Sequence, residues 1–301
     1  MSSRPLVWQT TRFRIDLRRP QVMGIVNLTP DSFSDGGQHA GPAAGLAHCE
    51  RLLKEGVDIL DIGGESSRPG APRLSADDEW ARVEGVLRGA LSLGVPVSID
   101  TCKAAVMQRA ADLGADILND IQALRDPGAE DVMATHPQLG ACLMHMRGDP
   151  GSMQSLTDYG DVVQEVAQFL GERAGVLRAR GIAAERLVLD PGYGFAKTVE
   201  QNFELLRRQG ELEALGYPLL AGLSRKSAIG AVTGRTVDQR LPGSLAAALL
   251  ALSRGARILR VHDVAATVDA LQVWGAGGGG GMGAEFIGEN ASHSKFGGRS
   301  Q

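Results

Sequence analysis

The stretch VMGIVNLTPDSFSDGG, residues 22–37, decides the fold. It begins with an apolar run without alternation, which is typical of a strand buried on both faces, as in the parallel sheets of α/β proteins. Pro30 and the pair Gly36 and Gly37 then interrupt regular structure, so Asn27 and the polar residues after it lie on a loop just past the strand. In α/β folds, the chemistry is carried at this carboxyl end of the strands.

Seven further segments repeat this order of buried strand, polar loop and helix. The other predicted strands are 57–62, 95–100, 116–119, 140–145, 186–190, 218–223 and 257–261. The predicted helices are 41–55, 75–93, 103–113, 128–135, 159–180, 199–209, 226 onward, 242–254 and a last one that ends at about 274. Eight such units predict an α/β protein, a single (β/α)8 barrel of the TIM type that occupies residues 1–274. A doubly wound open sheet is the alternative, but the sequence lacks its GxGxxG fingerprint and has no GxxxxGK[ST] phosphate loop.

Both ends of the chain differ from the repeating units. Within the N-terminal residues 1–19, Phe13, Ile15 and Leu17 alternate with polar residues, which predicts a β-hairpin that caps one end of the barrel. Residues 275–301 are rich in glycine and poor in apolar residues, so we expect a flexible tail outside the barrel.

Composition excludes several classes of partner. The 301 residues carry a net charge of -4 without an excess of one sign, which favours small-molecule partners over nucleic acid or a membrane surface. Cys49, Cys102 and Cys142 have no CxxC spacing, which favours reduced thiols over a disulfide or zinc site. The sequence has no secretory signal and no apolar run of the ~20 residues that a membrane span needs, so we predict a cytoplasmic location.

The polar residues at the strand ends form one set, because every loop after a strand lies on the same rim of a barrel. The set consists of Asn27, Ser67, Arg68, Asp100, Asn119, Asp120, His145, Arg147, Asp190, Lys226, Arg260 and His262. A single Asp or Asn at a strand end is more often a helix cap or a turn residue. Polar residues on all the loops together favour a binding site.

Cationic residues on this rim predict anion binding. Lys226 and Ser227 fall at a predicted helix start, where free N–H groups attract a phosphate or a carboxylate. Arg260 and His262, with Arg68 across the rim, suit a diphosphate. A Schiff-base role for Lys226 is an alternative.

The acceptors on the rim predict a heterocyclic ligand. Asp100, Asn119 and Asp190 match a ligand edge that is rich in N–H donors, as in a guanidine-like heterocycle. Phe195 and the Arg260 guanidinium are suited to stack on the faces of such a ring.

Eight strings of the sequence resemble the dihydropteroate synthase family of pterin-binding barrels. They are MGIVNLTPDSFSDGG, DIGGESSRPGA, SIDT, ILND, MHMRGDP, DPGYGFAKT, GLSRKS and RVHDV, in that family's order and spacing over roughly 20–274. The resemblance implies a transferase of folate biosynthesis, of the class targeted by sulfonamides. It would condense 6-hydroxymethyl-7,8-dihydropterin diphosphate with 4-aminobenzoate to 7,8-dihydropteroate and diphosphate, with Mg²⁺ bound. A homodimer is also implied.

The resemblance also implies a role for individual residues. Catalysis would be carried by Asp100, Lys226, Arg260 and Asn27. The pterin would be held by Asp100, Asn119, Asp190, Lys226, Phe195, Met144 and Ile121, and the diphosphate by Asn27, Arg68, Arg260 and His262. The aminobenzoate would contact Ser67, Pro69, Phe195, Ser227 and Phe33, and Mg²⁺ would bind Asn27, with Asp35 as a second candidate.

Two residues depart from the family pattern, which usually has Thr at Ser67 and often Phe at Tyr193. We expect these departures to alter affinity for substrates and sulfonamides more than the type of reaction. A pterin-dependent methyltransferase and a non-catalytic pterin-binding paralogue are the alternative functions, but the DSFSDGG, SSRPG and SRKS segments disfavour the first. The presence of both Asn27 and Arg260 disfavours the second.

Overall fold

The eight predicted strands close into one parallel barrel. The computed structural model describes residues 6–29, 41–66 and 73–279. Around the barrel the strand order is β10-β3-β4-β5-β6-β7-β8-β9. These strands are β3 (Gln21–Asn27), β4 (Ile59–Gly63), β5 (Val97–Asp100), β6 (Ile117–Asp120), β7 (Gly140–Met144), β8 (Leu187–Asp190), β9 (Leu219–Ala221) and β10 (Ala256–Val261). The (β/α)8 prediction is therefore confirmed, and closure of the sheet excludes the doubly wound alternative.

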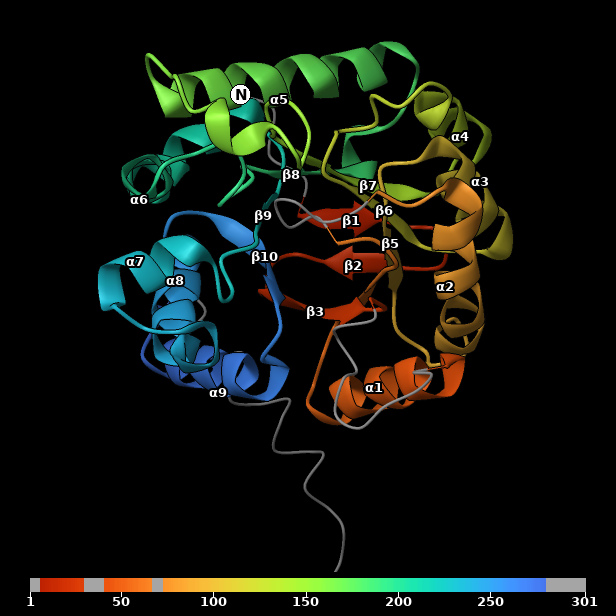
Figure 1. Ribbon diagram of the computed structural model, residues 1–301, viewed down its shortest axis with the longest axis horizontal. Helices are drawn as coiled ribbons and strands as arrows, with labels where there is room; N and C mark the ends of the chain where they lie inside the picture. Colours follow the sequence, from red (N-terminus) through yellow and green to blue (C-terminus); the bar gives the residue numbers. More distant parts are fainter. Residues whose placement is uncertain (1–5, 30–40, 67–72, 280–301) are drawn as a thin grey trace, which may run out of the picture.

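Helices surround the barrel, as Figure 1 shows. They are α1 (Pro42–Lys54), α2 (Ala76–Ala90), α3 (Ala104–Leu113), α4 (Ala129–Thr135), α5 (Val162–Ala179), α6 (Val199–Arg208), α7 (Ser227–Thr233), α8 (Leu241–Ser253) and α9 (Val264–Ala276). Short 3-10 helices are η2 (Met153–Ser155), η3 (Ala184–Arg186), η4 (Gln209–Leu215) and η5 (Val237–Gln239). Local signals set several ends: the Ser75 side chain accepts from the Asp78 N–H at the start of α2, and Gly114, with φ 102°, ends α3.

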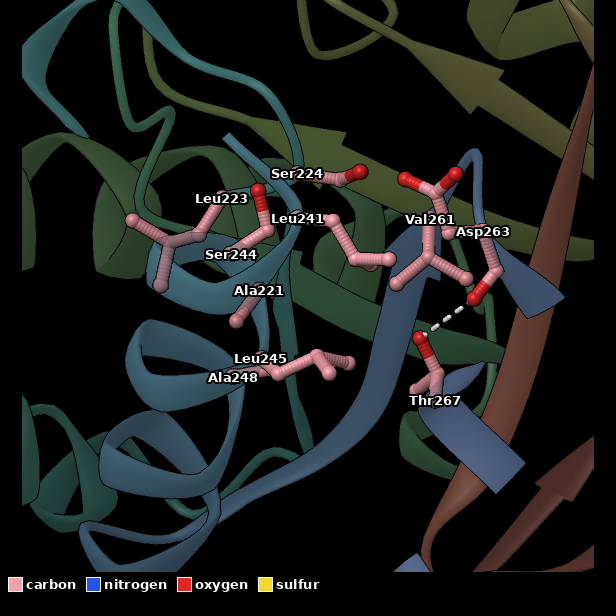
Figure 2. A pocket seen from close by; sticks show the side chains of 10 residues that line it. All are labelled: Ala221, Leu223, Ser224, Leu241, Ser244, Leu245, Ala248, Val261, Asp263 and Thr267. Atoms are coloured by element: carbon pink, nitrogen blue, oxygen red, sulfur yellow. Dashed lines mark hydrogen bonds between the residues drawn. The ribbon is translucent and has the colours of Figure 1, made fainter. Parts of the chain in front are cut away.

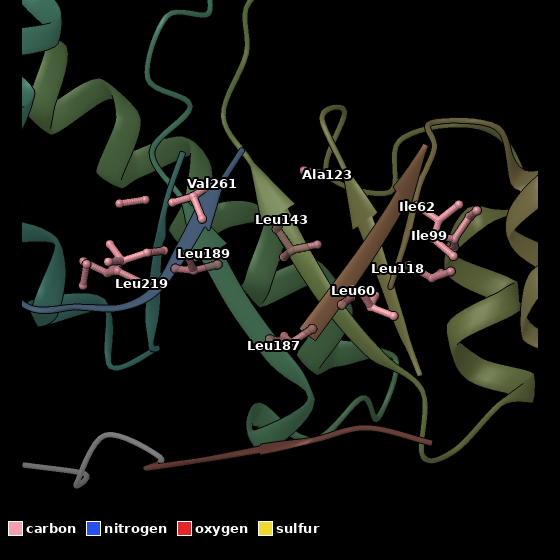
Figure 3. Close-up of a cluster of buried hydrophobic side chains, with 14 of the residues drawn as sticks. Leu60, Ile62, Ile99, Leu118, Ala123, Leu143, Leu187, Leu189, Leu219 and Val261 are labelled. Carbon is pink, nitrogen blue, oxygen red and sulfur yellow. The ribbon is translucent and has the colours of Figure 1, made fainter. Parts of the chain in front are cut away.

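Side chains alternate between the two faces of each barrel strand, and both faces are buried. Ile62, Ile99, Leu118, Leu143 and Leu189 belong to the apolar layer between the strands and the helices (Figure 3). The alternate positions point into the barrel. Its lowest inward layer consists of Met23, Ile59, Ile117, Cys142, Val188, Leu220 and Ile258. Burial on both faces explains why the strands read as apolar runs without alternation.

A hairpin closes the barrel at the amino ends of its strands, as predicted. Its strands β1 (Val7–Gln9) and β2 (Arg14–Asp16) pair antiparallel and lie across the ring of helices in Figure 1. Trp8, Ile15 and Leu17 pack against the lowest inward layer of the barrel. The Trp8 indole N–H, the one polar side-chain atom of these three residues, donates to the Arg186 carbonyl oxygen at 3.1 Å. The three residues form the hairpin plug.

Trp8→Ala is expected to lower the free energy of unfolding by about 3–5 kcal/mol, because it leaves a cavity in the floor of the barrel. Urea unfolding of the purified chain measures this loss. Arg18→Ala is the control in the same part of the chain, since the Arg18–Asp16 ion pair is exposed and such pairs contribute little. A loss for Trp8→Ala that equals the loss for Arg18→Ala would contradict a structural role of the plug.

The last helix extends slightly beyond the predicted end of the barrel. The last helix, α9, runs to Ala276, two residues past the predicted end, while residues 280–301 of the predicted tail lie outside the described residues.

Of the helices in the described ranges, none combines the length and the apolar character that crossing a bilayer requires.

Candidate active site

Polar side chains converge inside the barrel, above its apolar floor. On three strands the residue two positions after a floor residue is polar: Asp61 on β4, Asn119 on β6 and Arg260 on β10. Because side chains alternate, these three share the inward face with the floor residues. The same position is polar on a fourth strand, with Asp190 on β8, and apolar on β7, with Met144. The structure thus brings together polar residues from strands up to about 200 positions apart in sequence.

Arg260 links three strands across the mouth. Its Nε donates to Asp61 Oδ2 at 2.6 Å and its terminal nitrogen donates to Asp100 Oδ2 at 2.5 Å. Asn119 Nδ2 donates to the same Asp61 oxygen at 3.1 Å. Burial raises the pKa of Asp100 to about 7, although Arg260 acts in the opposite direction. Burial also works against the charge of Arg260, but Asp61 and Asp100 together raise its pKa above the ordinary value.

Asp61 is a central residue that the sequence prediction missed. It is 0% exposed, and its Oδ1 has no hydrogen-bond partner within the described part of the chain. The available signal was a carboxylate in the middle of the apolar run VDILDI, at a position that alternation assigns to the barrel interior. A buried carboxylate is costly unless it is paired, and Arg260 supplies that pair.

Asp190, Phe195 and Lys226 form the opposite side of the mouth. Asp190 is buried, and its Oδ1 accepts from the Gly192 N–H at 2.7 Å. Burial raises the pKa of Asp190, against the backbone hydrogen bond from Gly192 and the charge of Lys226. Lys226 Nζ lies 4.1 Å from the centroid of the Phe195 ring, and burial lowers the pKa of Lys226 to about 8. This ring face therefore already carries a cation.

The predicted apolar contacts gather beside these polar groups. Met144 and Phe195 belong to one buried cluster, and the partly buried Ile121 packs against it. The structure therefore brings all three residues to the same wall of the mouth, as a binding site for a flat ring requires.

The loop between β9 and α7 presents Lys226 and Ser227. Lys226 is the N-cap of α7, so the predicted helix start is confirmed. Arg225 has the left-handed φ of 57°, and its N–H donates to Ser244 Oγ at 2.9 Å. Its Nε donates to Asp263 Oδ2 at 2.9 Å. Ser244 and Asp263 also line a cavity of about 10 Å³ (Figure 2), which has room for one water and none for a substrate.

His262 lies beside this loop and contributes no charge to the predicted cationic patch. Its Nδ1 is 3.0 Å from Ser224 Oγ, and burial, with Arg260 nearby, lowers its pKa to about 3. The imidazole is therefore neutral at pH 7, and its chemistry is that of a hydrogen-bonding group. Of the predicted patch, only the arginines are cationic.

Several predicted residues lie outside the described residues, namely Phe33, Asp35, Ser67, Arg68 and Pro69. The ends of the segment that carries the last three are described. The Glu65 carboxylate accepts from the Leu74 N–H at 3.2 Å and also from Lys103 Nζ. Lys103 Nζ in turn donates to the buried Glu79 at 2.5 Å. The Glu65 carboxylate thus connects Glu65 directly to Leu74, the two residues that flank 66–73.

The metal prediction rests on Asn27, at the carboxyl end of β3 and paired in register with Gly63. Among the residues that the structure describes, no group of three or more His, Cys, Asp or Glu side chains is placed around a common point. Mg²⁺ is commonly held by one or two protein oxygens together with substrate phosphates. A single amide oxygen at the mouth fits a Mg²⁺ ion that arrives with a diphosphate.

Comparisons with known proteins agree with this geometry. A sequence model described as Pterin binding enzyme matches residues 23–262. Dihydropteroate synthase from Neisseria meningitidis serogroup C is 55% identical, over 90% of this chain and 97% of that protein. The enzyme from Xanthomonas albilineans, solved with 4-aminobenzoic acid, is 51% identical with a TM-score of 0.83, over 87% of this chain and 94% of that one.

A second solved relative comes from Burkholderia cenocepacia and was determined in complex with 7,8-dihydropteroate. It is 48% identical with a TM-score of 0.83, over 91% of this chain and 97% of that one. The family model covers most of the barrel, and the relatives are matched almost from end to end. The chain therefore belongs to the dihydropteroate synthases of the pterin-binding enzyme family.

Proposed function

We propose that the mouth of this barrel condenses 6-hydroxymethyl-7,8-dihydropterin diphosphate with 4-aminobenzoate, and we assign the steps to its residues. The carboxylate and amide set around Arg260 is the observation that carries the assignment. Solved relatives hold 4-aminobenzoic acid and 7,8-dihydropteroate, which are one substrate and the product of this reaction. A methyltransferase would need neither compound.

The pterin binds deepest, between the two sides of the mouth. Asp100, Asn119 and Asp190 accept hydrogen bonds from its N–H donors, and Lys226 donates to its acceptors. The apolar wall of Met144, Ile121 and Phe195 covers a ring face. Burial of Asp190 strengthens this recognition, because hydrogen bonds to a carboxylate count for more away from water.

The diphosphate lies above the pterin and is met by Asn27, Arg68, Arg260 and His262. Arg260 suits a departing diphosphate because its guanidinium is held in place by two carboxylates before any substrate arrives. Mg²⁺ at Asn27, with Asp35 as a second oxygen donor, would neutralise charge that develops on the diphosphate. The neutral His262 donates a hydrogen bond.

Carbon–oxygen cleavage then precedes attack by the amine. The bond between the pterin methylene and the diphosphate breaks, and its electron pair leaves with the diphosphate. Asp100 balances the cation-like methylene that develops. The aniline nitrogen forms the new carbon–nitrogen bond and gives up one proton. No protein nucleophile takes part, so catalysis by Asp100, Lys226, Arg260 and Asn27 is electrostatic and positional.

The aminobenzoate occupies the outer part of the mouth, against Phe33, Ser67, Pro69 and Phe195. Ser227, the first residue of α7, is exposed there and offers its hydroxyl and backbone N–H to the carboxylate. Two aromatic side chains and a proline suit the benzene ring.

A homodimer and a cytoplasmic location complete the proposal. Of the seven large apolar side chains that are exposed among the described residues, four lie on α7, η5, α8 and α9, on one side of the molecule in Figure 1. They are Val232 (60% exposed), Val237 (50%), Leu250 (44%) and Val273 (74%). An exposed apolar surface of this kind suits a second copy of the chain.

The test is product formation by the purified chain from both substrates, with and without Mg²⁺. We expect one dihydropteroate for each diphosphate released, and loss of at least about tenfold in rate when a chelator removes the metal. Pterin binding without product, at saturating Mg²⁺ and both substrates, would instead identify a non-catalytic pterin-binding protein.

A further inference from the structure

Lys197 is a buried lysine that the proposed reaction does not use, and burial lowers its pKa to about 7. It is 4% exposed and lies in the loop between β8 and α6. Its Nζ donates to the Gly192 oxygen at 2.9 Å and the Phe195 oxygen at 3.0 Å, and lies 3.0 Å from His145 Nδ1. None of these three acceptors carries a negative charge. Lysine is rarely buried without a carboxylate partner, so this arrangement calls for a function.

The three contacts shape the loop around the ammonium. Gly192 has φ 70°, and a Cβ there would overlap the His145 carbonyl oxygen, so the loop passes tightly over the end of β7. The Phe195 N–H donates to the Gly192 oxygen at 3.1 Å, which closes a turn. Both carbonyl oxygens that bind Lys197 therefore belong to one turn, and Lys197 Nζ links the two ends of that turn.

His145 is suited to accept from Lys197 because it is neutral. Burial, with the charge of Lys197, lowers the pKa of His145 to about 2. Its ring is fixed by an edge-on contact with Phe169, with centroids 5.1 Å apart. The ammonium therefore joins the loop to a fixed point at the end of β7.

Phe195 connects this anchor to the site. Its backbone oxygen binds Lys197, while its ring packs in the apolar cluster of Met144 and Met153 and faces Lys226. Any shift of the turn moves the ring. Asp190, by contrast, is part of the β8 strand and is held by the barrel itself.

We propose that Lys197 is a positioning residue that sets the Phe195 ring and thereby the affinity for 4-aminobenzoate. The inference rests on the proposed function of the site, in which Phe195 contacts the aminobenzoate. Lysine suits this role because its single Nζ reaches both carbonyl oxygens and the His145 ring at once. The strand-borne pterin contacts depend less on the turn.

Lys197→Met is the main test, since it keeps the length of the side chain and removes its donors. We expect the KM for 4-aminobenzoate to rise roughly tenfold or more, because small misplacements of a binding group are costly. The kcat and the KM for the pterin diphosphate should change by a clearly smaller factor, because Asp100, Asn119 and Asp190 lie on strands and Phe195 is only one of several pterin contacts. The matched control is Gln154→Ala, which removes only a 3.5 Å hydrogen bond from an exposed side chain to the Gly194 oxygen of the same loop.

A double-mutant cycle separates positioning through Phe195 from general destabilisation. In a Phe195→Ala background, Lys197→Met should add less than about twofold to the KM for 4-aminobenzoate. Additive effects, or equal changes in both KM values and kcat, would overturn the proposal. If Lys197→Met does not fold, Lys197→Gln carries the same cycle, because it retains a donor for one carbonyl.

Failure of this inference can be told apart from failure of the proposed function. Calorimetric titration with 4-aminobenzoate, in the presence of Mg²⁺ and inorganic diphosphate, measures binding without turnover. Binding by the unaltered chain without product formation contradicts the reaction alone, and the variants still test the positioning. Absence of binding by the unaltered chain overturns both.

Discussion

Asp190→Ala is expected to weaken binding of the pterin diphosphate by about 30-fold to 5,000-fold. Truncating one partner of a buried, hydrogen-bonded charged pair costs about 2–5 kcal/mol of binding free energy, and each 1.4 kcal/mol is a factor of ten. Asp190 is 6% exposed, so water cannot replace the lost carboxylate. Lys226→Ala should have a similar effect, since it removes the cation on the same side of the mouth.

Calorimetry with the pterin diphosphate and steady-state kinetics measure both effects. Asp77→Ala is the control, because the Asp77 side chain is 83% exposed on α2 and its ion pair with Arg109 is a surface pair. Unchanged steady-state rates in either Asp190→Ala or Lys226→Ala would refute the assignment of the pterin pocket to this part of the mouth.

Asp61→Asn should lower kcat/KM for the pterin diphosphate by about 100-fold or more. The substitution keeps the shape of the side chain but replaces the carboxylate that pairs with Arg260 and accepts from Asn119 with a neutral amide. Loss of one partner of a buried charged pair costs about 3–5 kcal/mol in stability as well, so thermal unfolding is followed in parallel.

Ser98→Ala is a matched control for Asp61→Asn. Ser98 is the register partner of Asp61 on β5 and is also 0% exposed, but its hydroxyl has no hydrogen-bond partner among the described residues. We expect kinetics close to those of the unaltered chain. In an Arg260→Lys background Asp61→Asn should cost less than it does alone, because the guanidinium that it orients is gone. Equal kinetic effects of Asp61→Asn and Ser98→Ala would show that Asp61 does not act through Arg260.

The fold could be predicted from the sequence because each strand is buried on both faces and ends in a polar loop. The predicted boundaries were less accurate: β4 and β5 begin two residues later than predicted, at Ile59 and Val97. Val57 is buried against the outside of the barrel, at the approach to β4, without being part of the strand. An apolar sequence indicates which residues are buried, but not where the strand begins. A strand begins only where its backbone pairs in register with the neighbouring strand.

The site could be predicted only in part. Asn119, Asp190 and Arg260 stood at recognisable strand ends, whereas Asp61 lies inside the apolar run of β4, where only its position in the alternation marks it as facing the interior. The role of Lys197 could not be predicted for another reason. Its partners are two backbone carbonyls and a histidine 52 positions away, and no sequence pattern specifies contacts of that kind.

The hairpin plug closes one end of the barrel, so its interior has a single opening. Trp8 and its neighbours fill the lower end, so every ligand enters and leaves past the same loops. In the proposed arrangement, the pterin contacts Asp100, Asn119 and Asp190 lie on the strands, whereas Phe195 and Ser227, which contact the aminobenzoate, lie beyond the carboxyl ends of β8 and β9. The ligand that binds deeper in the barrel has to bind before the ligand that covers it. The product has to dissociate through the same opening before either substrate can bind again. Because the other end of the barrel is closed, the two ligands have to bind and leave in a fixed order.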